Sequence, residues 1–105
     1  MDKFQSLSAN RLLFDLASRL GSLEGYLYAE DKVDKSYLPN WLGNIEREFD
    51  CLSADTRNEI GADYGELLRK VHALLRRLYG DQDGNTAKAA AMITDLSKEG
   101  TRERT

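Results

Sequence analysis

The sequence predicts an all-α protein, a small four-helix up-down bundle, and three observations support this fold class. Apolar residues recur at spacings of three and four in four separate segments. No segment alternates polar and apolar residues over the length of a strand. The 105 residues contain one proline, Pro39, so long stretches are free to be helical. We expect a single helical domain over 1–100 and a disordered tail over 101–105.

The first helix is predicted over 7–29. Ser6 or Ser8 would cap its N-terminus, because serine oxygens accept hydrogen bonds from the free backbone N–H groups of a first turn. Leucines at helical spacing give it one apolar side: Leu13, Leu16, Leu20, Leu23 and Leu27. The polar stretch 30–36 then indicates a loop.

The second and third helices are predicted over 39–52 and 54–79. Pro39 suits a first turn, where its missing N–H would be unpaired in any case. Ser53 is the clearest N-cap in the chain, and Gly80 is a natural residue to follow a helix C-terminus. The apolar stripes of the two helices are formed by Leu38, Leu42, Ile45, Phe49 and Leu52, and by Ile60, Tyr64, Leu67, Leu68, Val71, Leu74, Leu75 and Leu78.

The fourth helix is predicted over 86–98. The segment 81–85 indicates a turn, and Asn85 or Thr86 can cap the short helix that follows. Gly100 is expected to end it.

The first predicted helix carries a second face that a minimal bundle does not need. This face holds small residues in its middle and aromatic ones at both ends: Phe14, Ala17, Gly21, Gly25 and Tyr28. A glycine in a helix interior costs about 1 kcal/mol relative to alanine, so close packing of another helix would explain Gly21 and Gly25. That helix belongs either to this chain or to a dimer or protein partner. Gly61 and Gly65 form a similar pair, which could pack against the first pair; alternatively, Gly61 could mark a bend near the start of the third helix.

Two aromatic residues, Tyr37 and Trp41, stand out around the start of the second helix. They could close one end of the bundle as part of its core. They could also anchor a protein partner, since tyrosine and tryptophan dominate binding hot spots. The sequence leaves both interpretations open.

A basic cluster occupies the second half of the third helix: Arg69, Lys70, Arg76 and Arg77. Acids dominate the first half of that helix, and this order is favoured by the helix dipole. The simplest interpretation is a solvated, helix-stabilising face. The alternative is a patch for nucleic acid or an acidic partner, although a net charge of −3 gives no global attraction to phosphate.

The sequence predicts no catalytic, cofactor-binding or metal site. His72 and Cys51 are its single histidine and single cysteine, and they lie too far apart in sequence to suggest a ligand or catalytic pairing. A histidine on a bundle helix resembles the phospho-accepting residue of histidine phosphotransfer domains. Those domains typically carry lysine at +3 and a small residue at +4, whereas Leu75 and Arg76 stand here.

We therefore expect a non-enzymatic helical protein–protein interaction module that self-associates through its first helix. The alternatives are a nucleic-acid-associated regulator using the basic cluster and, less favoured, a histidine phosphorelay-type domain. A single cysteine, no apolar run of membrane length and no secretory leader favour a cytoplasmic location without membrane contact.

Overall fold

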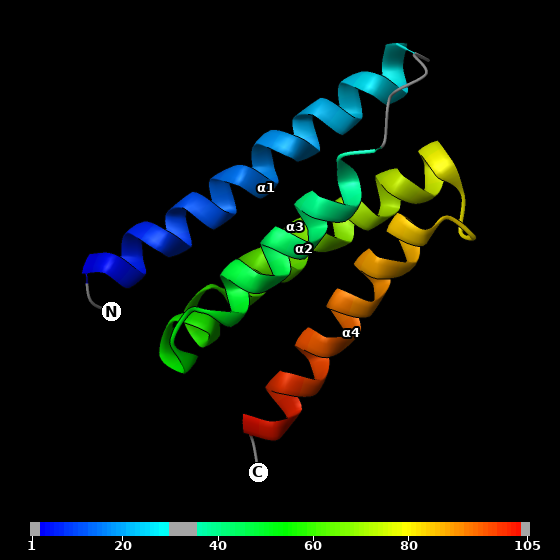
Figure 1. Ribbon diagram of the computed structural model, residues 1–105. Helices are drawn as coiled ribbons and strands as arrows, with labels where there is room; N and C mark the ends of the chain where they lie inside the picture. The colour runs from blue at the N-terminus through cyan, green and yellow to red at the C-terminus, as the bar shows by residue number, and fades with distance from the viewer. Residues whose placement is uncertain (1–2, 30–35, 104–105) are drawn as a thin grey trace.

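The computed structural model describes residues 3–29 and 36–103 of the chain. These residues form four helices and no strand, so the all-α, four-helix prediction is confirmed (Figure 1). The helices are α1 (Lys3–Ala29), α2 (Leu38–Asp50), α3 (Ala54–Tyr79) and α4 (Gly84–Glu103).

One hydrophobic core joins all four helices, and the predicted leucine stripes supply most of it. Burial of these side chains is the main force that holds the helices together, because most helical stability in proteins comes from packing an amphipathic face. The largest fully buried apolar side chains are Leu12, Leu16, Leu23, Leu38, Leu42, Ile45, Leu68, Val71 and Leu75.

The packing order of the helices differs from the simplest expectation. Helix α1 packs most extensively on α3, and α3 packs on α4, while α2 makes smaller contacts with α1 and α4. Figure 1 shows α1 and α3 running in the same general direction, with α1 along one edge of the molecule. A bundle in which helices that follow one another in sequence lie side by side is therefore not confirmed.

Helix α1 begins four residues before its predicted start at residue 7, so Ser6 and Ser8 lie inside it and do not cap it. A tertiary contact fixes this extra turn. The side-chain oxygen of Gln5 accepts a hydrogen bond from the backbone N–H of Ser53 at 2.9 Å. The first turn of α1 is thereby tied to the α2–α3 connection.

The α2–α3 connection is held by local hydrogen bonds, and the predicted cap of α3 is confirmed. Ser53 Oγ accepts from the backbone N–H of Thr56 at 3.3 Å. The guanidinium of Arg57 donates to the carbonyls of Asp50 and Leu52, at 3.2 and 2.6 Å, which satisfies acceptors left free where α2 ends. Helix α2 thus ends at Asp50, two residues earlier than predicted.

The two ends of the α3–α4 turn use different caps. Gly80 follows α3 with φ of 90°, a conformation that favours glycine, and its N–H donates to the carbonyl of Arg76 at 2.9 Å. Asp83 precedes α4, and its carboxylate accepts from the N–H of Asn85 at 2.9 Å. Asp83 therefore takes the capping role that was predicted for Asn85 or Thr86.

Helix α4 is longer than the predicted 86–98 because it continues through Gly100 to Glu103. Of the predicted tail, residues 104–105 lie outside the described residues. The predicted loop at 30–36 also lies outside them, except for its last residue.

Candidate functional site

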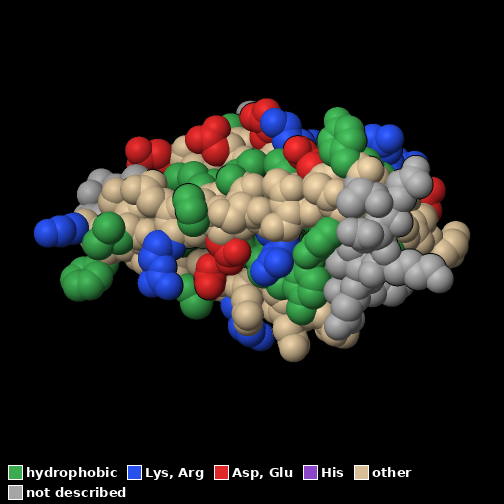
Figure 2. Space-filling view, turned by 90° about the horizontal axis from the view of Figure 1, so that it is seen from above, with side chains coloured by type: hydrophobic (Ala, Val, Ile, Leu, Met, Phe, Trp, Pro, Cys, Tyr) green, Lys and Arg blue, Asp and Glu red, His purple; other side chains and the backbone are tan. Residues whose placement is uncertain are grey.

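All four large apolar side chains that stand exposed in the described residues belong to α1. Phe4, Leu7, Phe14 and Tyr28 are 83%, 54%, 75% and 89% exposed. Single exposed apolar residues are common on protein surfaces, but four on one helix, with none exposed on the other helices among the described residues, mark α1 as distinct. Figure 2 shows apolar side chains projecting from the surface between charged ones.

These four residues share one side of α1 with three small residues of the predicted second face. Ala17, Gly21 and Gly25 are also exposed. At about 100° per residue, this side lies roughly 180° from the leucines that α1 buries. We call it the outer face of α1: Phe4, Leu7, Phe14, Ala17, Gly21, Gly25 and Tyr28.

The glycines of the outer face pack against nothing among the residues that the structure describes. A Cβ atom added to Gly21 or Gly25 would meet no atom within 4 Å. Of the two explanations that the sequence left open for this pair, close packing by another of the four described helices of the same chain is therefore wrong. The outer face of α1 has no covering segment in the part of the chain that the structure describes.

Two members of this face, Phe4 and Leu7, were not predicted from the sequence. The signal was present, because Leu7 precedes Phe14 by seven residues and Phe4 precedes Leu7 by three. Placing the helix start at residue 7 removed Phe4 from the helical pattern and left Leu7 at its edge.

The aromatic pair at the start of α2 faces inward. Trp41 is 7% exposed and its indole Nε1 donates to Asp15 Oδ1 at 3.2 Å. The guanidinium of Arg19 lies 4.6 Å from the ring centre of Tyr37 and 5.6 Å from that of Trp41, within cation–π range. These contacts dock α2 on the side of α1. We therefore leave Tyr37 and Trp41 out of the candidate surface, and their predicted role in partner binding stays a prediction.

The second glycine pair, on α3, does not meet the first. A Cβ on Gly65 would lie 3.0 Å from Leu96 Cδ2, so Gly65 allows α4 to approach α3 closely. A Cβ on Gly61 would meet nothing within 4 Å. The suggested packing of the two glycine pairs against each other is wrong.

The basic cluster of α3 is exposed, and half of its charges lie beside acids. Lys70 Nζ lies 3.4 Å from Glu66, as the i,i+4 spacing predicts, and Arg76 Nε lies 2.5 Å from Asp81. Exposed pairs of this kind contribute about 0–1 kcal/mol. They lower the local positive charge, whereas Arg69 and Arg77 form no ion pair with an acid in the described part of the chain. His72 lies half-buried on the same helix, and Cys51 is exposed at the end of α2.

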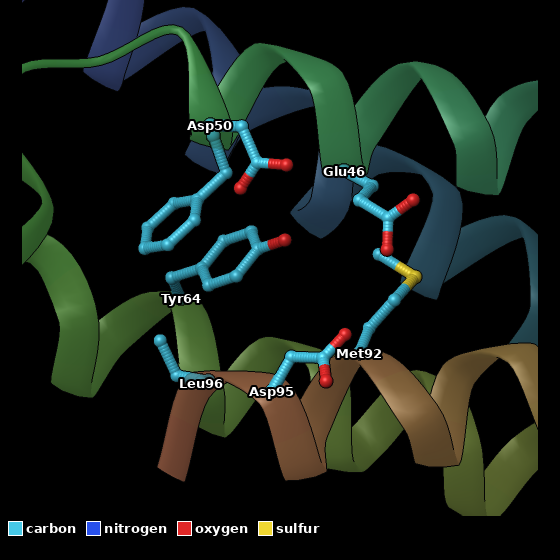
Figure 3. A pocket seen from close by; sticks show the side chains of 7 residues that line it. Glu46, Asp50, Tyr64, Met92, Asp95 and Leu96 are labelled. Atoms are coloured by element: carbon cyan, nitrogen blue, oxygen red, sulfur yellow. The ribbon is translucent and has the colours of Figure 1, made fainter. Parts of the chain in front are cut away.

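A small cavity lies between α2, α3 and α4. Its volume is about 50 Å³, well below the roughly 300–1,000 Å³ typical of ligand pockets. Figure 3 shows the carboxylates of Glu46, Asp50 and Asp95 around the hydroxyl end of Tyr64. Glu46 pairs with Lys88 at 2.7 Å. This cavity offers room for water only.

A wider groove runs between the N-terminal half of α1 and the C-terminal half of α2. Its volume is about 490 Å³. It is lined by Gln5, Ser8, Arg11, Asn44, Arg47, Glu48, Cys51 and Leu52. Its polar groups serve the fold in part: Gln5 accepts from Ser53, and Arg47 donates to Asn44.

Within the described ranges, no three His, Cys, Asp or Glu side chains come together in a way that could hold a metal ion. No helix among these residues is both long and apolar enough to cross a bilayer. Comparison of the chain with protein-family models, with curated proteins and with solved structures found no match. The strongest candidate for a functional surface is the outer face of α1.

Proposed function

We propose that this chain is a non-enzymatic helical interaction module that binds a protein partner through the outer face of α1. The observation that carries the proposal is the gathering of Phe4, Leu7, Phe14 and Tyr28 on one side of one helix, opposite the core. Apolar surface of this kind is stabilised when another protein covers it. Adaptor, regulator and small subunit are all roles that fit, and the proposal includes a cytoplasmic location.

The geometry of the face fits binding by a helix. Aromatic side chains provide large contact areas and dominate hot spots. The two glycines between them leave a shallow stretch in which a second helix can approach the backbone closely. Nucleic-acid binding through α3 is not part of this proposal, since acids lie beside two of its four basic residues.

The experiment compares three tagged forms of the chain as baits in an extract of its native cells: wild type, Phe14→Glu and Ala91→Glu. Phe14 and Ala91 are both exposed helical residues, so each variant gains one charge without removing a core contact. We expect wild type and Ala91→Glu to retain the same protein, identified by mass spectrometry, and Phe14→Glu to lose it. Retention of an identical set of proteins by all three forms would contradict the proposal.

A further inference from the structure

A heptad-spaced seam runs along the outer face of α1; it includes every residue of that face except Ala17, together with Arg11 and Ser18, which lie between them. Its exposed positions are separated alternately by three and four residues and run through Phe4, Leu7, Arg11, Phe14, Ser18, Gly21, Gly25 and Tyr28. This is the spacing of the two contact positions of a coiled coil, where a 3.5-residue period keeps one seam facing a partner helix. The 27 residues of α1 give a seam of about 40 Å.

Large and small residues are distributed unevenly along this seam. Its N-terminal half carries Phe4, Leu7, Arg11 and Phe14, whereas its C-terminal half carries Ser18, Gly21 and Gly25 before the terminal Tyr28. Two such seams fit each other when they run in opposite directions. Each bulky residue of one copy then lies over a small residue of the other, apart from the aromatic pair at each end.

The register of that arrangement follows from the numbering. In an antiparallel pair centred on position 16, Leu7 faces Gly25 of the second copy and Phe14 faces Ser18. Phe4 and Tyr28 of the two copies meet at each end of the seam.

The charges along the seam also favour the antiparallel arrangement. Arg11 is the one charged residue at a contact position of the seam. In a parallel pair, Arg11 would face Arg11 of the second copy, and like charges in contact repel. In the antiparallel pair it lies over Gly21 and close to the exposed Glu24 of the second copy, an opposite charge.

The exposed apolar area is near the small end of what a dimer buries. The three exposed aromatic side chains can each bury about 150–250 Å². Together with the half-exposed Leu7 they come close to the roughly 600 Å² per partner of the smallest standard interfaces. A two-fold axis through the middle of the seam makes every contact twice, as a self-complementary interface requires.

We infer that the outer face of α1 binds a second copy of this chain, with the two α1 helices packed as an antiparallel coiled coil. This inference rests on the proposed function and names the partner. No described part of the chain lies over the outer face, since it is opposite the core.

Chemical crosslinking tests both whether a second copy is the partner and whether the two α1 helices are antiparallel. In a Cys51→Ser background, which removes the single native thiol, Leu7→Cys and Gly25→Cys are prepared as separate proteins. In the antiparallel dimer, position 7 lies opposite position 25. Two copies of position 7 are separated by eighteen residues of helix, or about 27 Å, and so are two copies of position 25.

We expect a short bismaleimide to crosslink the mixture of the two proteins and to leave each protein alone uncrosslinked. Adding Phe14→Glu to both proteins should abolish the crosslink, while adding Ala91→Glu should preserve it. Crosslinking of either protein alone would contradict the antiparallel direction, and no crosslink in any sample would refute the second copy as partner. In that last case, the bait experiment in cell extract still tests the proposed function separately. If Phe14→Glu loses a protein other than a second copy of this chain, the outer face binds that protein instead.

Discussion

Replacing Gly21 and Gly25 together by alanine is expected to make the monomer more stable. Each glycine in a helix interior costs about 1 kcal/mol relative to alanine. The added methyl groups meet no atom within 4 Å, so no packing is lost. Gly25 lies close to the end of α1, where the benefit is smaller, and we expect a gain of about 1.5 kcal/mol in the free energy of unfolding.

The assay is urea unfolding followed by circular dichroism, in the Phe14→Glu background so that monomers are compared. A gain of this size should also raise the melting temperature by roughly 6–12 °C for a domain of this length. Gly65→Ala is the control variant, because its added Cβ would lie 3.0 Å from Leu96 Cδ2. This close contact should cancel some or all of the stability that alanine adds to a helix. Destabilisation by the Gly21 and Gly25 replacements would refute the claim that these glycines have no role within the fold.

Three further changes test the fold that presents the outer face. Leu16→Ala removes a fully buried side chain and should lower the free energy of unfolding by about 2–5 kcal/mol in urea titrations. Ser53→Ala removes the α3 cap and should cost about 0.5–2 kcal/mol, whereas Ser53→Asp, which keeps a capping oxygen, should restore most of that loss. Trp41→Phe removes the indole N–H that donates to Asp15, and it should lower the free energy of unfolding by about 1 kcal/mol, the net contribution of one hydrogen bond. Calorimetry should detect this loss as a lower melting temperature. Little or no effect of these three changes would show that the packing and hydrogen bonds described here do not stabilise the protein.

Periodicity predicted the four helices because each buries one stripe of apolar residues, and this signal is local. The helix ends were harder to predict, since tertiary contacts decide them. The first turn of α1 is tied by Gln5 to Ser53, 48 residues away, and no local pattern announces that bond. Asp83 was missed as the cap of α4 because Asn85 and Thr86 are equally good capping residues by type.

The candidate surface was predicted in part. The small and aromatic residues on the second face of α1 could be identified from the sequence: Phe14, Ala17, Gly21, Gly25 and Tyr28. Whether these residues face another helix of the chain depends on how the helices pack, which the sequence alone did not decide. The order of the helices around the core is a global property: α1 neighbours α3 more closely than α2. The inward direction of Trp41 likewise depends on Asp15 and Arg19, which approach it only when α2 docks on α1.

Sedimentation equilibrium of the wild type, Phe14→Glu and Ala91→Glu measures whether two copies of the chain bind each other through the outer face of α1. At ~100 µM protein, even the weakest stable interfaces, with micromolar dissociation constants, are largely occupied. We expect twice the chain mass of 11.9 kDa for the wild type and for Ala91→Glu, and the single chain mass for a folded Phe14→Glu. A wild type that sediments as a single chain at this concentration, or a Phe14→Glu variant that remains a dimer, would contradict the assignment of the outer face of α1 as the surface where two copies meet.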